Sequence, residues 1–100
     1  MKLTDHCKRS YDTFGNCWAD VHEWLDEFAG MTYPLHNHRS VRHHMGGVYE
    51  VREKWGVPAS EAAYQHILDD IISRGISAVP ENREEAEKIF GDMDEFIEGD

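Results

Sequence analysis

The sequence has few cysteines and no long apolar run. Its two cysteines, Cys7 and Cys17, do not form a C-x-x-C motif, which excludes a thiolate zinc finger. Because they lack secretory context and repeated spacing, we expect two reduced, partly buried thiols. The longest uncharged apolar run is far too short to span a membrane, and the start MKLTDHCKRS lacks the apolar core of a signal peptide. The expected compartment is therefore the cytoplasm.

Basic residues are also scarce, since 20 Asp and Glu stand against 10 Lys and Arg, a net charge of −10. Residues 81–100 hold nine acids and two bases, a net of −7, which leaves −3 for the first eighty residues. A surface of this charge repels nucleic acid and membranes, so we expect direct binding to neither. It can instead mimic the charge of DNA toward a basic partner protein, or simply form a solvated helix face.

One hundred residues with 40% hydrophobic content suffice for a single domain with one modest core. Apolar residues recur at helical spacings, and no convincing alternating strand occurs. The predicted fold is all-α, a compact antiparallel bundle of four to five helices. Residues 1–80 are expected to form its histidine-rich core and residues 81–100 an acidic C-terminal amphipathic helix of the same domain.

Glycine, proline and capping residues place the predicted helix boundaries. The expected helices are residues 4–13, a segment from an Asn16 cap to a Gly30 stop, 38–55, a segment from Pro58 to Gly75, and a last helix interrupted or bent at Gly91. On the first helix we expect the stripe of Leu3, Cys7, Tyr11 and Phe14 to face the core. Gly46 and Gly47, inside the third helix, indicate a break, a close helix crossing or space for a ligand.

Three histidines fall on or next to the buried stripes of three different helices, namely His22, His44 and His66. A buried ring without partners costs about 1–3 kcal/mol, so each must find a hydrogen bond or a metal. In a continuous helix His43 points about 100° away from His44, so we expect His44 to face inward with His43 as its neighbour. The alternative is three ordinary core histidines, each bonded to a carbonyl or an aspartate.

An aspartate follows two of these histidines at a spacing of four, which places each pair on one helix face. Histidine nitrogens and carboxylate oxygens from several bundle helices are the usual ligands of zinc, manganese or iron. The sequence therefore predicts a divalent transition-metal site, structural or hydrolytic. Its candidate ligands are His22, Asp26, His43, His44, His66 and Asp70.

The segment from His36 to His43 is the only dense cationic stretch of the chain. Within it, Arg39 and Arg42 are candidate ligands for a phosphate or another anion, although an arginine paired with a nearby glutamate is the commoner arrangement. Beside a metal they would suit a metal-assisted phosphohydrolase. No Ser/His/Asp triad, phosphate-binding glycine loop or nucleophile motif is present, which disfavours the nucleophilic enzymes.

Several of these motifs occur together in the order HEWLD at 22–26, HRxxRHHxxG at 38–47 and QHxxD at 65–69. In this the chain resembles a family of small phage and bacterial proteins of unknown function. The resemblance covers about residues 5–80 and implies a phage or prophage context in a bacterial host cell. It also implies a recurring histidine set, His6, His22, His38, His43, His44 and His66, but no activity.

A second likeness, of architecture only, is to helical metal-dependent phosphohydrolases with a His…His-Asp…Asp set, although here Asp5-His6 stands in the reverse order. The alternative to a metal protein is a non-enzymatic interaction protein that inhibits a host factor. It would use the acidic C-terminal helix, with Glu84, Glu87, Asp94 and Glu95 as its contact residues.

Overall fold

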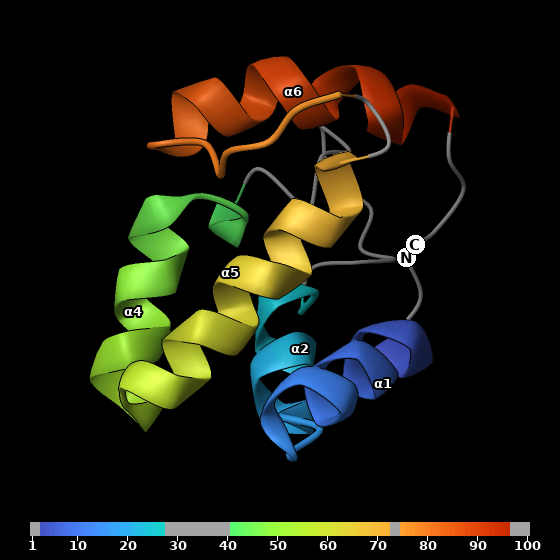
Figure 1. The fold of residues 1–100 in the computed structure, drawn as a ribbon. Helices are drawn as coiled ribbons and strands as arrows, with labels where there is room; N and C mark the ends of the chain where they lie inside the picture. The colour runs from blue at the N-terminus through green and yellow to red at the C-terminus, as the bar shows by residue number, and fades with distance from the viewer. Residues whose placement is uncertain (1–2, 28–40, 73–74, 97–100) are drawn as a thin grey trace.

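Five α-helices form the part of the chain that the computed structural model describes, residues 3–27, 41–72 and 75–96 (Figure 1). The described residues contain no strand, which confirms the predicted all-α bundle. None of the described helices is long and apolar enough to cross a membrane. The helices are α1 (Leu3–Phe14), α2 (Ala19–Leu25), α4 (Met45–Trp55), α5 (Val57–Ile71) and α6 (Arg83–Phe96).

Helix α5 lies at the centre and packs against α4, α2 and α1. Figure 1 shows α6 crossing above α4 and α5, where Ala86 is fully buried. The backbone N–H of Met45 donates to the Pro80 carbonyl at 2.8 Å and so ties the start of α4 to the segment before α6. The buried core consists of Val21, Leu25, Val48, Val51, Ala59, Ala63, Ile67, Ile71, Val79 and Ala86.

Several predicted boundaries are confirmed. Gly15, with φ +77°, follows the end of α1, and Gly56, with φ +99°, separates α4 from α5. Pro58 lies in the first turn of α5, where its missing N–H costs nothing.

Asn16 does not cap a helix directly, but its side-chain oxygen accepts a hydrogen bond from the N–H of Trp18 at 2.9 Å, just before α2. Helix α6 continues through Gly91 without interruption.

Two predicted helices end or break earlier than expected. Helix α2 stops at Leu25 rather than near Gly30, because Asp26 leaves the helical conformation and its carboxylate enters a cluster of histidines. The predicted helix at 38–55 is not continuous either, since His43 and His44 form a bend before α4 begins. Gly47 makes this bend feasible, because a Cβ there would overlap the Arg42 carbonyl.

The buried face of α1 differs from the predicted stripe. Tyr11 is 63% exposed, whereas His6 and Ser10 are buried. Helix α1 is thus rotated toward its polar residues, because these meet buried histidines on other helices.

The two cysteines form a disulfide, which corrects the prediction of two reduced thiols. Because the chain turns back after Gly15, Cys17 returns to the side of α1, and the two Cα atoms are 4.5 Å apart. The disulfide holds α1 against the start of α2.

Candidate metal centre

Four histidines and two aspartates meet in the core between α1, α2 and α5. His6 lies on α1 and His22 on α2. Asp26 directly follows α2, and His43 lies in the bend before α4. α5 supplies the remaining two, His66 and Asp70. We call these six residues the His/Asp cluster. Its four histidines are 0–1% exposed and Asp70 is 4% exposed, so the cluster belongs to the interior.

Two histidine nitrogens of the cluster face each other and one oxygen of each aspartate. His43 Nε2 is 3.2 Å from His66 Nε2 and 3.3 Å from both Asp26 Oδ1 and Asp70 Oδ2. His66 Nε2 is 3.4 Å from Asp26 Oδ1 and 3.6 Å from Asp70 Oδ2. An ion bound at about 2.0–2.1 Å to four tetrahedral ligands holds them about 3.3–3.4 Å apart. Asp26, His43 and His66 are therefore positioned to hold a metal ion, and Asp70 Oδ2 lies at a similar distance from both histidines. We call these four residues the tetrahedral set.

Electrostatics keep both carboxylates of the tetrahedral set ionised. Burial alone would raise the pKa of Asp26 and Asp70, but their contacts with histidines outweigh it and hold both pKa values well below the usual range. Burial would likewise lower the pKa of His43, yet the two carboxylates raise it. Without a metal, the two carboxylates therefore favour the imidazolium form of His43.

For two further histidines of the cluster, His22 and His66, burial favours the neutral ring. Burial lowers the pKa of His66 to about 3, and the charges of His43 and His6 act in the same direction. Burial, followed by the charge of His6, lowers the pKa of His22 to about 4. A neutral imidazole offers a free lone pair, which is the form that binds metals.

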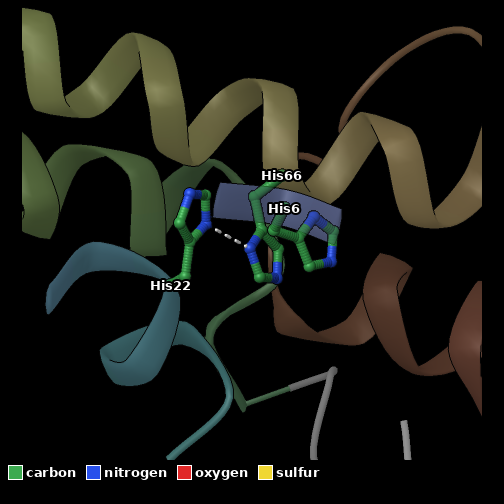
Figure 2. Close-up of side chains that lie close together, drawn as sticks. All are labelled: His6, His22 and His66. Atoms are coloured by element: carbon green, nitrogen blue, oxygen red, sulfur yellow. Dashed lines mark hydrogen bonds between the residues drawn. The ribbon is translucent and has the colours of Figure 1, made fainter. Parts of the chain in front are cut away.

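A chain of hydrogen bonds leads from His66 back to α1. The Nδ1 atoms of His66 and His22 are 2.8 Å apart, and Figure 2 shows this bond with the rings of both residues. His22 Nε2 lies 2.7 Å from the hydroxyl of Ser10. We call Ser10, His22 and His66 the relay. It fixes how the His66 ring is turned toward the tetrahedral set.

His6 stacks on His66, with the ring centroids 3.6 Å apart and the planes inclined by 13° (Figure 2). Its Nε2 lies 3.3 Å from Asp70 Oδ1, and neither ring nitrogen has a hydrogen bond within the described part of the chain. The nitrogens of His6, His22 and His66 form a second group close enough to share an ion.

Five of the six predicted metal ligands lie in the cluster, and His44 does not. His44 precedes α4, is half-buried, and its Nε2 donates to the Val41 carbonyl at 3.0 Å. The bend turns His43 inward in its place, so the expectation that His44 faces the core is wrong. His6 and Ser10 were missing from the predicted ligands. Their spacing of four residues on α1, opposite the histidine stripe of α2, was the available signal.

Of the two arginines predicted to bind an anion, the structure describes only Arg42. Arg42 donates to the Trp24 carbonyl at 2.7 Å, pairs with Glu27, and lies 4.0 Å above the Trp24 ring. It thereby fastens the segment before α4 to the end of α2, and its role toward an anion stays a prediction. Arg39, like His36 and His38, lies outside the described residues.

The acidic helix can be described in part. Glu84 and Glu87 are exposed on α6, and Glu87 pairs with Arg83 at 3.5 Å. The side chains of Asp94 and Glu95 lie outside the described residues. Partner binding through this helix stays a prediction.

Comparison with known proteins gives one family. No curated protein and no solved structure matches the chain. The model of a family described as "Domain of unknown function (DUF6915)" matches residues 1–86, which include the whole His/Asp cluster. The chain therefore belongs to the DUF6915 family.

Proposed function

We propose that the protein binds a divalent transition-metal ion through Asp26, His43, His66 and Asp70. The observation that carries this proposal is that the Nε2 atoms of His43 and His66 lie 3.2 Å apart and 3.3–3.6 Å from one oxygen of each carboxylate. These five separations are close to the edges of a tetrahedron around an ion with bonds of about 2.0–2.1 Å. Tetrahedral nitrogen and oxygen ligands favour zinc, and iron or manganese would require further ligands.

Charge balance supports the same proposal. The buried carboxylate of Asp70 and the largely covered carboxylate of Asp26, facing neutral imidazoles, have a net charge of −2, which a dication neutralises. Burying unpaired charge is expensive, so the ion would replace the imidazolium form of His43 as the counterion of Asp26 and Asp70. Binding would release the His43 proton to solvent.

The relay supports coordination through His66 Nε2. With the Nε2 lone pair on the metal, Nδ1 of His66 carries the proton and donates to His22 Nδ1. His22 then carries its own proton on Nε2 and donates to the Ser10 hydroxyl. This assignment satisfies each bond of the relay, and it is the arrangement that orients histidine ligands in metal proteins.

In this proposal the ion cross-links the end of α2, the bend before α4, and α5. A site with four protein ligands is typical of a structural metal, whereas a catalytic metal keeps one position open. Asp26, whose side chain is 15% exposed, is the ligand nearest solvent. The phosphohydrolase activity therefore requires a displaced Asp26 or a further ion, and a screen of phosphate esters with added zinc, manganese or iron tests it.

The test of metal binding uses protein prepared without a histidine tag, stripped with a chelator and titrated with Co²⁺ and Zn²⁺. We expect a tight equivalent of Co²⁺ with the intense visible absorption of tetrahedral cobalt, which Zn²⁺ bleaches. His43→Gln removes this absorption, whereas His44→Gln, the matched control outside the cluster, retains it. A spectrum without the tetrahedral bands, or one unchanged in His43→Gln, would reject the proposal.

The interaction hypothesis needs a test that spares the core. Because Ala86 is fully buried, deletion of residues 81–100 would damage the fold along with the acidic surface. The double change Glu84→Gln and Glu87→Gln removes two exposed charges instead. If α6 binds a basic partner, this variant loses the partner with unchanged thermal stability, and normal capture would reject the hypothesis.

A further inference from the structure

His6 is the member of the cluster that the tetrahedral set does not use. Its side chain is 0% exposed, and neither nitrogen has a hydrogen bond within the described residues. Leaving a buried polar group unsatisfied costs about 1–3 kcal/mol. The contact of His6 Nε2 with Asp70 Oδ1, at 3.3 Å, offsets part of this cost.

The carboxylate of Asp70 faces two different places. Its Oδ2 belongs to the tetrahedral set, 3.3 Å from His43 Nε2 and 3.6 Å from His66 Nε2. Its Oδ1 instead faces His6 Nε2. One carboxylate thus presents an oxygen to each of two neighbouring positions, as a bridging ligand does.

Ring stacking sets the distance between these two positions. The His6 and His66 rings are nearly parallel with their centroids 3.6 Å apart, and each directs Nε2 at one oxygen of Asp70. Ions bound in the planes of such rings lie about as far apart as the rings do. Paired ions in two-metal sites are about 3.5–4 Å apart.

We infer that a second divalent ion binds on His6 Nε2 and Asp70 Oδ1, with Asp70 bridging it to the ion of the tetrahedral set. This inference rests on the proposed function. The described residues supply two protein ligands to the second ion, so water completes its shell. It is therefore the weaker and more exchangeable ion, and it offers the open coordination positions that the tetrahedral ion lacks.

The group of His6, His22 and His66 is the competing place for a second ion. Within this group His66 faces His22 through Nδ1, and the two Nδ1 atoms are already 2.8 Å apart in the relay. This separation is a hydrogen bond, shorter than the roughly 3.3 Å edge of a tetrahedral site. An ion there would also make His66 bind metals through both nitrogens, which requires loss of its last ring proton.

The experiment is titration of the metal-free wild-type chain with Mn²⁺ and with Zn²⁺, followed by calorimetry and native mass spectrometry. We expect two bound equivalents, the second weaker, and an electron paramagnetic resonance spectrum of two coupled Mn²⁺ ions. His6→Gln binds a single equivalent and shows no coupling, whereas His44→Gln, the control, behaves as wild type.

The outcomes separate the two proposals. One equivalent in the wild type, or two in His6→Gln, overturns the second ion and leaves the tetrahedral site standing. No bound metal overturns both. If His6→Gln does not fold by circular dichroism, the wild-type spectrum decides, because two uncoupled Mn²⁺ ions contradict a shared carboxylate. Both candidate places include His6, so His22→Gln separates them: a second equivalent that is lost in His22→Gln as well as in His6→Gln would place the ion in the competing group, and so also overturn the inference.

Discussion

The relay makes Ser10 a sensitive test of the site, although its hydroxyl is bonded to His22 and not to one of the four proposed metal ligands. In the proposed protonation, the hydroxyl accepts the proton of His22 Nε2 at 2.7 Å, and His22 in turn accepts from His66 Nδ1 at 2.8 Å. Ser10→Ala removes the acceptor with a minimal change in volume. The substitution leaves all four proposed metal ligands and the α1 backbone in place.

The structure gives two separate magnitudes for Ser10→Ala. Ser10 is fully buried and His22 is 1% exposed, so losing the bond costs about 1–3 kcal/mol of stability. Without Ser10, His22 is held less firmly and orients His66 less well, so His66 becomes a poorer ligand and zinc affinity falls by about 10–100-fold.

Ser60→Ala is the matched control. The Ser60 hydroxyl is also buried in an internal bond, donating to the Val57 carbonyl at 2.6 Å, but it lies about 9 Å along α5 from His66. Urea unfolding should show similar losses of stability in both variants. Competition for zinc against a chromophoric chelator should show weaker binding in Ser10→Ala alone. Zinc affinity in Ser10→Ala within about twofold of that in Ser60→Ala would refute the relay, since 10–100-fold is expected.

Two further predictions concern the metal-free protein. His22 and His66 stay neutral in the fold down to about pH 4 and about pH 3, whereas in the unfolded chain both take up protons below about 6.5. The free energy of unfolding should therefore decrease as the pH is lowered from about 6.5 to 4, by up to about 3 kcal/mol per pH unit. If urea titrations in the presence of a chelator gave the same free energy of unfolding across this range, they would contradict the prediction. The disulfide closes a loop with a sequence separation of 10, so Cys7→Ser should lower stability by about 3 kcal/mol, or roughly 12–24 °C in melting temperature. A calorimetric shift below about 3 °C would show that the Cys7–Cys17 bond does not form.

Sequence periodicity predicted α5 best. Its apolar spacing runs unbroken from Ala59 to Ile71, so the helical wheel placed His66 on the buried face correctly. Asp70 then follows one turn later on the same face. Where a helix is continuous, sequence spacing alone locates a site residue.

The same reasoning fails where the backbone bends. Each helical residue turns the side-chain direction by about 100°, so a break at 43–44 exchanges an inward residue for an outward one. Gly46 and Gly47 signalled a break, but they could not indicate that His43 and not His44 would turn inward. That choice depends on Asp26 and Asp70, which reach His43 from the residue after α2 and from α5.

Helix α1 shows a second limit. Its apolar spacing favoured Tyr11 for the core, yet the fold buries Ser10 and His6 and exposes Tyr11. Their burial is favourable only because His22 and Asp70 meet them there. Such polar pairs are formed by tertiary structure, and a hydrophobic pattern in one segment does not record them.

The central claim is that four core side chains bind one ion tetrahedrally. An anomalous difference map from crystals of the zinc-loaded protein tests it most directly. We expect a strong zinc peak at about 2.0–2.2 Å from His43 Nε2, His66 Nε2, Asp26 Oδ1 and Asp70 Oδ2. Zinc bound only at surface carboxylates or at His44, with no peak inside the tetrahedral set, would contradict it.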